Sequence, residues 1–448
     1  MNFNKDRFAV VGLGETGLSI IRYLRYQKAN LVRVYDTREV LPHQDRFKSL
    51  DVRLGQLKYA DFSDIDVIVI SPGVSIYEKA LIQALHNGKE VIGDVELFAR
   101  SITDWQSKII GITGSNGKTT VTTLTGYLAG ASGLNTLVAG NIGIPVLDSY
   151  VDIISSGGAI PDIIVLELSS FQLETISSLQ LNAATVLNIM PDHLDRYRDL
   201  LEYAYIKANI FNNCDHQVLN VDDALVCSMV RNRQLLSWFG NAASEYTIKD
   251  KCLCIGGEKY LSANELALVG QHNYFNVLAS LALLNAVGID VCEDNIKQAL
   301  RQFQGLEHRM QKIAVHDGVC YIEDSKGTNV GAVVAGVSGL DGTVHLILGG
   351  DGKGQDFTPL KALVSNKCKS VAIIGQDKLL IAKALEGLDN VAVEVFATLP
   401  EAVAYCYRNA QHGEYVVLSP ACASWDMFDD YKHRAQVFID SVYKNIHG

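Results

Sequence analysis

A glycine-rich segment at residues 113–119 reads TGSNGKT and follows a short apolar run that is typical of a β-strand. The backbone N–H groups of such a loop can surround phosphate oxygens, while Lys118 reaches the outer phosphates and the hydroxyl of Thr119 binds a magnesium ion. The standard phosphate-binding loop has glycine at the position of Ile112, so this pattern is a narrower variant. The segment predicts a triphosphate site made of Gly114, Ser115, Asn116, Gly117, Lys118, Thr119 and Thr120.

A second glycine motif, VVGLGETGLS, lies near the N-terminus. Gly12, Gly14 and Gly17 have the spacing G-x-G-x-x-G after an expected strand, and Asp36 ends the next strand. Read alone, the motif is typical of a dinucleotide site, because glycine lets the backbone approach a diphosphate at a helix N-terminus. Any diphosphate ligand suits the motif equally well, and a purely structural turn stays an alternative. The Ser-Pro-Gly sequence at residues 71–73 ends the third strand and could line the same crevice.

Three residues in the middle of the chain could bind a metal ion. Glu167 lies near the end of the apolar strand DIIVLELSS, where a buried carboxylate is costly unless it is paired or bound to metal. His193 follows another apolar strand in NIMPDHLDRY, and Lys207 lies on the helix after it. A lone histidine after a strand is more often packed, and a lone helical lysine is usually solvated. Spacing alone leaves both interpretations open.

The segment HNYFN at residues 272–276 offers two amide side chains. If the segment is helical, Asn273 and Asn276 share one face and could hydrogen-bond a base or join two domains. An N-capping asparagine beside a surface asparagine is an equal alternative.

The last third of the chain carries four polar motifs: EHR, DSKGTN, GGDGKG and LSPACAS. The last three each follow an apolar strand directly, and loops in that place often carry function. The candidate residues are Arg309, Asp324, Lys326, Thr328, Lys353 and Ser424.

Short β-rich runs alternate with helical stretches, which predicts an α/β protein with mostly parallel sheets. The expected strands cover residues 8–13, 31–35, 67–70, 109–113, 162–168, 184–189, 319–322, 345–348, 371–374 and 415–418. Nearly every motif follows one of these strands, where open α/β sheets bind ligands. Three clusters of motifs predict three domains at residues 1–103, 104–305 and 306–448, with linkers at residues 101–107 and 304–309.

The composition restricts the class of protein. The 448 residues carry a formal net charge of −11 and form no basic cluster, which argues against nucleic-acid binding. No apolar run approaches the length of a membrane span, and the N-terminus lacks the pattern of a signal peptide. The 9 cysteines contain no C-x-x-C pair and are expected to be reduced thiols of a cytoplasmic protein.

Together, these motifs resemble the Mur ligase family, whose members join amino acids to UDP-linked muramic acid. The resemblance covers the whole chain in order, through TGSNGKTT, ELSSFQLE, DHLDRY, HNYFN, EHR, DSKGTN, GGDGKG and LSPACAS. It implies a Rossmann-like N-terminal domain that binds a uridine diphosphate, a central P-loop-type ATPase domain with a mostly parallel sheet, and a C-terminal Rossmann-like α/β domain. Several motifs are most similar to those of the members that add D-glutamate.

The resemblance also implies roles for individual residues. The UDP-substrate would be bound by Gly14, Glu15, Thr16, Asp36, Thr37, Arg38, Ser71, Gly73 and Asn141. ATP would be bound by the loop at residues 114–120 together with Asn273, Asn276, Arg309 and Asp324. Two magnesium ions would be bound by Thr119, Glu167, His193 and Lys207, the last as a carbamate, which supplies the anionic oxygen that magnesium prefers.

The catalytic residues implied are Lys118, His193, Lys207, Lys326 and Arg309. D-glutamate would be bound by Thr328, Lys353, Ser424 and Tyr431, although a phenylalanine is expected at position 431. The implied reaction is ATP-dependent addition of D-glutamate to UDP-N-acetylmuramoyl-L-alanine through an acyl phosphate, in cytoplasmic peptidoglycan synthesis by a monomer. The alternatives are another Mur ligase, a folylpolyglutamate synthase, a nicotinamide oxidoreductase or a nucleotide-binding switch.

Overall fold

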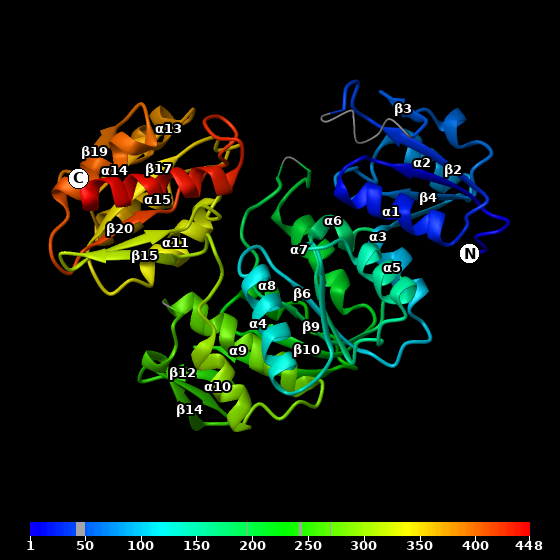
Figure 1. Cartoon of the computed structure of the whole chain (residues 1–448), viewed down its shortest axis with the longest axis horizontal. Coiled ribbons are helices and arrows are strands. Elements are labelled where there is room, and N and C mark those ends of the chain that lie inside the picture. The colour runs from blue at the N-terminus through cyan, green and yellow to red at the C-terminus, as the bar shows by residue number, and fades with distance from the viewer. Residues whose placement is uncertain (42–49, 195, 242–243, 269) are drawn as a thin grey trace. The chain divides into compact units, whose positions relative to one another are not determined.

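The structure is a computed structural model that describes residues 1–41, 50–194, 196–241, 244–268 and 270–448. The described residues form three sheets with helices packed on them, which confirms the predicted α/β class (Figure 1). The chain divides into two compact units: Met1–Leu261 with Val277–Leu300, and Ser262–Asn276 with Arg301–Gly448. The first unit holds two of the sheets, and the second unit holds the third.

The N-terminal sheet has the strand order β3-β2-β1-β4-β5, and all its pairs are parallel. Its elements are β1 (Arg7–Val11), α1 (Glu15–Tyr26), β2 (Leu31–Asp36), β3 (Val52–Leu54), β4 (Val67–Ile70), α2 (Lys79–His86), β5 (Glu90–Gly93) and α3 (Asp94–Ser101). The four residues of β4 are all buried, as expected for a parallel strand covered on both faces. The chain adds β2 and β3 on one side of β1 and then β4 and β5 on the other side, so the order of the strands reverses between β1 and β4. In open α/β sheets the crevice for a ligand lies where two such strands end.

The central sheet has the order β14-β13-β12-β11-β10-β9-β6-β8-β7. Its strands are β6 (Lys108–Thr113), β7 (Thr136–Gly140), β8 (Ile163–Glu167), β9 (Leu181–Val186), β10 (Cys214–Asn220), β11 (Leu235–Gly240), β12 (Tyr246–Lys249), β13 (Cys252–Ile255) and β14 (Glu258–Ser262). The helices between them are α4 (Lys118–Ala131), α5 (Val146–Ser156), α6 (Ser170–Leu173), α7 (Leu200–Ala208) and α8 (Ala224–Cys227). Two further helices follow, α9 (Gln271–Ala286) and α10 (Asp294–Gln302). Figure 1 shows α5 beside α1 and α3, so this helix joins the central sheet to the N-terminal one.

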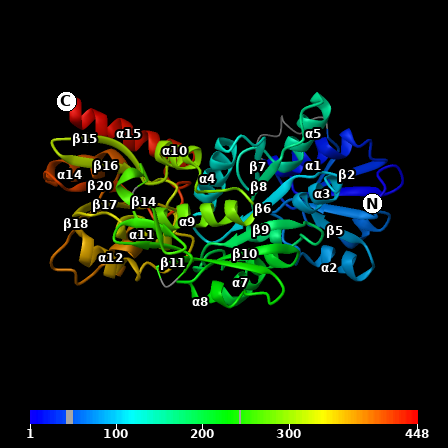
Figure 2. The ribbon, with the colours of Figure 1, turned by 90° about the horizontal axis from the view of Figure 1, so that it is seen from below.

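The C-terminal sheet has the order β15-β16-β20-β17-β18-β19, and Figure 2 shows β15, β16, β20, β17 and β18 following one another. Its strands are β15 (Gln311–His316), β16 (Val319–Glu323), β17 (Val344–Gly349), β18 (Cys368–Ile374), β19 (Ala392–Val395) and β20 (Tyr415–Leu418). Its helices are α11 (Val330–Ser338), α12 (Leu360–Lys367), α13 (Lys378–Ala384), α14 (Leu399–Asn409) and α15 (Tyr431–His447). Only β15 is antiparallel to its neighbour among the pairs whose register is described.

Each of the ten expected strands is present, with ends displaced by no more than a few residues. Both ends of β9 are displaced, since it was expected at residues 184–189 and is found at Leu181–Val186. Both expected linkers fall on connections, because residues 102–107 separate α3 from β6 and residues 303–310 separate α10 from β15. The domain boundaries near residues 104 and 306 stay a prediction. No helix among the described residues is long and apolar enough to cross a membrane.

Candidate active site

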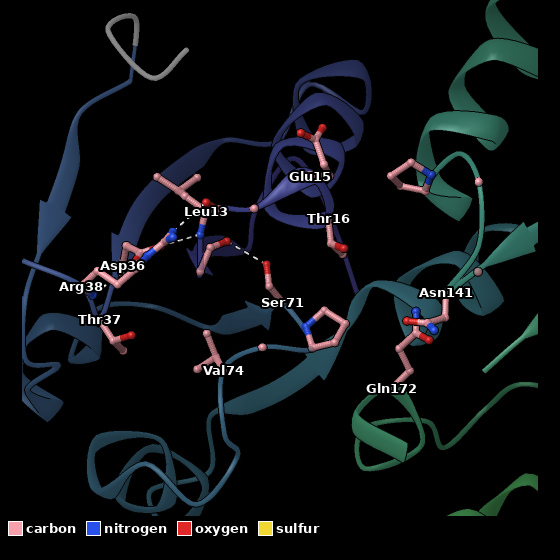
Figure 3. Close-up of a pocket in the computed structure, with 17 residues that line it drawn as sticks. Leu13, Glu15, Thr16, Asp36, Thr37, Arg38, Ser71, Val74, Asn141 and Gln172 are labelled. Atoms are coloured by element: carbon pink, nitrogen blue, oxygen red, sulfur yellow. Dashed lines mark hydrogen bonds and ion pairs between the residues drawn. The ribbon is translucent and has the colours of Figure 1, made fainter. Parts of the chain in front are cut away.

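A cavity of about 610 Å³ opens where β1 and β4 end. The N-terminal glycine motif and the loop after β4 form one wall, and residues that follow β7 and β8 form the other (Figure 3). Figure 3 places Glu15 and Thr16, on the first turn of α1, on one side of the cavity, with Asn141 and Gln172 on the other. It is lined by Gly12, Leu13, Gly14, Glu15, Thr16, Asp36, Thr37, Arg38, Ser71, Pro72, Gly73, Val74, Gly140, Asn141, Gly143, Pro145 and Gln172.

The glycine motif is required by the geometry of this turn. Gly12 has a φ of +94°, and a Cβ there would lie 2.7 Å from Val74 Cγ2. A Cβ on Gly17 would lie 2.0 Å from the carbonyl oxygen of Gly12. Gly14 is the N-cap residue just before α1 and has no side chain to cap the helix, which is the arrangement that accepts an anion at a helix N-terminus.

Asp36 is 2% exposed and is held by Leu13 and Arg38. One of its oxygens accepts from the N–H of Leu13 at 2.7 Å and from Arg38 Nη2 at 2.8 Å. The other accepts from the N–H and the Nε of Arg38, at 3.0 and 2.8 Å. Burial acts to raise the pKa of Asp36, but these hydrogen bonds outweigh it and lower the pKa. Because each oxygen already accepts two bonds, the carboxylate is poorly suited to bind the ribose of a dinucleotide.

Asn141 connects the cavity to the candidate metal ligand Glu167. Its Nδ2 donates to Glu167 Oε1 at 2.9 Å, and its backbone N–H donates to the carbonyl oxygen of Glu167 at 2.8 Å. Glu167 is 2% exposed at the end of β8, and within the described residues its buried Oε2 has no hydrogen-bond partner. A buried carboxylate oxygen without a donor is a position where a cation would bind favourably.

The phosphate-loop motif connects β6 to α4, as the sequence predicts. Gly117, with a φ of +86°, caps α4, and Lys118 is the first residue of that helix. Lys118 Nζ donates to the carbonyl oxygens of Gly114 at 2.8 Å and Ser115 at 2.9 Å. The ammonium group is therefore held over the concave side of the loop, close to where phosphates would bind.

A segment after β9 supports this loop. Asn188 Oδ1 accepts from the N–H of Asn116 at 2.8 Å, and Asn188 Nδ2 donates to the carbonyl oxygen of Asn116 at 3.1 Å. Ser115 Oγ donates to the carbonyl oxygen of Met190 at 3.0 Å and accepts from its N–H at 2.8 Å. These bonds connect the phosphate-loop motif to the segment that carries His193.

Lys207 is a buried amine beside the same loop. It is 1% exposed, and its Nζ donates to Thr113 Oγ1 at 3.1 Å and lies 4.8 Å from the ring centre of Tyr203. Burial is the main cause that lowers its pKa well below the usual value, and the charge of Lys118 lowers it further, while Asp192 and Glu167 act to raise it. Lys118, Asp192 and Glu167 thus lie close enough to Lys207 for their charges to act on its amine.

His193 lies in a strained turn on the segment after β9. It has a φ of +53°, and its ring packs edge-on against Phe171 at 4.8 Å and lies 6.5 Å from Tyr203. Its side chain is 44% exposed, so the imidazole is accessible to a ligand. No three His, Cys, Asp or Glu side chains of the described residues form a metal-binding group. The expected magnesium ligands are not a group of this kind, because they include the hydroxyl of Thr119 and the carbamate of Lys207 beside Glu167 and His193.

The second unit holds the other expected ATP contacts. Asn273 and Asn276 lie on α9, and Asn276 Nδ2 donates to Asn273 Oδ1 at 3.2 Å, which confirms that they share a face. Asp324 follows β16 and accepts from Ser419 Oγ at 2.6 Å and from the N–H of Met310 at 3.1 Å. Burial raises the pKa of Asp324 to about 7, although both hydrogen bonds act to lower it, and Arg309 lies close enough for its charge to lower it too.

Three loops, those after β16, β17 and β20, meet at the carboxyl ends of the C-terminal strands. Gly327 accepts from the N–H of Ala421 at 2.9 Å, and Gln355 bonds both the N–H of Val330 and the carbonyl oxygen of Ala421. Lys326 Nζ lies 3.9 Å from the ring centre of Tyr431. These loops carry the expected amino-acid ligands: Thr328 and Lys353 are exposed, Ser424 is 3% exposed and Tyr431 is half-buried.

Arg434, which the sequence motifs did not indicate, holds two of these loops. It is fully buried on α15 and donates to Ser325 Oγ at 2.9 Å, the carbonyl oxygen of Ser325 at 2.8 Å and that of Cys422 at 3.0 Å. Asn188, Tyr203 and Gln172 were not among the predicted site residues, although Asn188 lies in the quoted segment NIMPDHLDRY and Gln172 in ELSSFQLE. Asn188 lies within the strand expected at residues 184–189, and the structure places it just after β9, which ends at Val186.

Three family models match the chain. They are the N-terminal domain of MurD-like Mur ligases at residues 6–93, the Mur ligase middle domain at residues 112–284, and the Mur ligase glutamate ligase domain at residues 308–422. Two relatives, from Chromobacterium violaceum and Methylobacillus flagellatus, are both named UDP-N-acetylmuramoylalanine–D-glutamate ligase. Each is 46% identical; the first match covers 99% of this chain and 98% of the relative, and the second covers 97% and 96%.

Solved structures of similar fold include a pseudomurein peptide ligase type C from Methanothermus fervidus, with a TM-score of 0.58 and 18% identity over 97% of this chain and 100% of that one. The UDP-N-acetylmuramate–alanine ligase of Thermotoga maritima has a TM-score of 0.59 and 17% identity over 98% and 99%. At these identities the likeness concerns the fold alone. The family models and the two relatives, which extend along nearly the whole sequence, show that the chain belongs to the Mur ligase family.

Proposed function

We propose that the protein is an ATP-dependent ligase that adds D-glutamate to UDP-N-acetylmuramoyl-L-alanine. The observation that carries the proposal is the 46% identity, over 99% of the chain, to a relative named for that reaction. The geometry agrees with it, because a cavity suited to a diphosphate and a phosphate-binding loop belong to one compact unit.

The UDP-substrate occupies the cavity between β1 and β4. Its diphosphate lies at the N-terminus of α1, near Gly14, Glu15 and Thr16, where backbone N–H groups favour an anion. The pocket is completed by Asp36, Thr37, Arg38, Ser71, Gly73 and Asn141. The acceptor carboxylate extends toward Glu167, to which Asn141 is bonded.

The first chemical step is attack of the acceptor carboxylate on the γ-phosphoryl group of ATP, which gives an acyl phosphate and ADP. Residues 114–120 surround the triphosphate, and Lys118 neutralises charge on the transferring group. Asn273, Asn276, Arg309 and Asp324 bind ATP as well. In the second step the amine of D-glutamate attacks the acyl phosphate, and phosphate leaves.

Two magnesium ions are part of the proposal, and their expected ligands are Thr119, Glu167, His193 and the carbamate of Lys207. The orphaned oxygen of Glu167 and the lowered pKa of Lys207 support this assignment. When bound, magnesium neutralises phosphate charge that an acidic protein alone would repel. The carbamate forms when the neutral amine of Lys207 attacks carbon dioxide and loses a proton.

D-glutamate is held by the C-terminal loops. Lys353 with Thr328 binds one carboxylate, and Ser424 with nearby backbone N–H groups binds the other, because each buried anion needs a partner. Lys326, which lies against the Tyr431 ring, is assigned to the reaction centre. Tyr431 stands where a phenylalanine is expected, and its additional hydroxyl leaves this packing intact.

The three domains divide these tasks: residues 1–103 bind the UDP-substrate, residues 104–305 bind ATP, and residues 306–448 bind the amino acid. The protein acts in the cytoplasm as a monomer on these small molecules. A phosphate-release assay with the acceptor and a panel of amino acids tests the choice of substrate. D-glutamate should give the highest rate, and a higher rate with alanine, a diamino acid or a dipeptide would assign the protein to another branch of the family.

Replacing Lys353 with alanine should raise the KM for D-glutamate about ten- to a hundredfold, since the loss of a charged hydrogen-bond partner typically costs about 1.5–3 kcal/mol. The KM for ATP should stay within twofold of wild type. Lys361→Ala, at an exposed lysine of the same domain, is the matched control. A Lys353→Ala enzyme with an unchanged glutamate KM and weaker ATP binding would place Lys353 on the phosphate side.

A further inference from the structure

Arg196 lies two residues before the end of the DHLDRYR segment and makes contacts that the reaction described above does not use. Its Nε donates to Glu174 Oε1 at 3.1 Å, and its Nη2 donates to Glu174 Oε2 at 2.5 Å. Its Nη1 donates to the carbonyl oxygen of Pro72 at 3.3 Å, and its Nη2 also donates to that of Val74 at 3.2 Å. One guanidinium group thus binds a carboxylate of the central domain and two backbone carbonyls of the N-terminal domain.

The surroundings of this side chain fix its geometry. The Arg196 side chain is 10% exposed, and that of Glu174 is fully buried. The guanidinium carbon lies 4.2 Å from the ring centre of Phe171, and Tyr197 Oη donates to the same Glu174 carboxylate at 2.8 Å. A planar guanidinium can satisfy a carboxylate and two carbonyls at once, whereas an ammonium cannot match these directions.

The groups that Arg196 joins belong to opposite sides of the candidate site. Pro72 and Val74 line the diphosphate cavity, and Val74 packs against the first glycine turn. On the other side, Phe171 packs under both Arg196 and the imidazole of His193. The loop at residues 71–74 and the turn at His193 therefore share one anchor.

We propose that Arg196 is a positioning residue that sets the distance between the wall of the UDP-substrate cavity and the turn that carries His193. This inference rests on the proposed function, because it concerns where the acceptor carboxylate arrives relative to the phosphate loop. A displacement of reacting groups by about 1 Å can reduce the rate a hundredfold, so an anchor between the two ends of an extended substrate affects the reaction without touching it.

Other bonds hold the two domains together without Arg196. Glu96 on α3 accepts from the N–H groups of Ser177 at 2.8 Å and Ser178 at 2.9 Å, and Arg22 on α1 pairs with Asp148 at 3.0 Å. None of these residues lines the cavity. Loss of the Arg196 contacts should therefore leave the domains folded and packed, and should alter the position of the loop at residues 71–74.

The test compares Arg196→Lys with Arg198→Lys, which changes an exposed arginine of the same segment whose partner is Glu202. Arg196→Lys should raise the KM for UDP-N-acetylmuramoyl-L-alanine at least tenfold and leave the KM for ATP within twofold. The ATP loop should be unaffected because Asn188 and Met190 hold it by bonds of their own. Arg198→Lys should leave both KM values within twofold of wild type.

Glu174→Gln is the second variant and should shift the acceptor KM in the same direction by a smaller factor. If Arg196→Lys does not fold, the KM values of Glu174→Gln for the acceptor and for ATP test the inference in its place. An acceptor KM and a kcat that both stay within twofold of wild type would overturn the inference, and so would a KM for ATP that rises as much as the KM for the acceptor. A wild-type enzyme that couples no amino acid refutes the proposed function instead, so the two failures are distinguishable.

Discussion

Replacing Lys118 with alanine is expected to lower kcat by about a hundredfold or more, the usual scale for the loss of one preorganised charge contact to a transition state. The Lys118 ammonium is held by the carbonyl oxygens of Gly114 and Ser115, at the start of α4 and on the concave side of the loop. It needs little rearrangement to meet a phosphoryl group, so its charge is available when the γ-phosphoryl transfers. Steady-state rates of phosphate release at saturating substrates measure the effect.

Lys108→Ala is the matched control, because Lys108 is an exposed lysine at the opposite end of the strand that leads into the same loop. Its rate should equal that of wild type. A Lys118→Ala enzyme that retains activity within a few-fold of wild type would remove the loop lysine from the mechanism.

The Lys207→Ala enzyme is expected to lose about a hundredfold or more of its activity, and short carboxylic acids should partly restore it. Lys207 is buried, and burial lowers the pKa of its amine well below the usual value, which favours the neutral form that reacts with carbon dioxide. A small carboxylate added from solution supplies the same kind of anionic oxygen in the space that the side chain leaves.

Lys118→Ala provides the control for this rescue, since an anion cannot replace a lost ammonium group. Activity assays with and without added formate or acetate, on both variants, make the measurement. A Lys207→Ala enzyme as active as wild type, or equal stimulation of both variants by acids, would contradict the carbamate assignment.

The sequence predicted the parts of the fold that depend on local pattern. The strand β4, which is fully buried, and the strand β20, buried except at its first residue, have the expected bounds, because continuous apolar runs between turn residues mark parallel strands clearly. The strand β9 begins three residues earlier than expected, since its first half, LNA, is less apolar than the residues that follow the strand. The strands β10 to β14 carry no motif, and none of them is among the strands expected from the sequence.

The candidate site was predictable where a motif surrounds a ligand and unpredictable where residues support one another across the fold. The loop around Lys118 is recognisable because phosphate binding restricts its residue types over a short stretch. Its partner Asn188 lies 72 residues away from Asn116, and a single asparagine in a loop has no pattern of its own. Arg196 and Arg434 are similar cases, since their roles follow from burial and from contacts with carbonyl oxygens that any residue could supply.

The central claim is the identity of the reaction, and the mass of the UDP-linked product tests it most directly. Purified protein is incubated with ATP, magnesium and UDP-N-acetylmuramoyl-L-alanine, together with either D-glutamate or L-glutamate. The account predicts a product heavier than the acceptor by one glutamyl unit with D-glutamate only, formed with an equal amount of phosphate and ADP. Equal products from both enantiomers, or no product with D-glutamate while another amino acid is coupled, would contradict it.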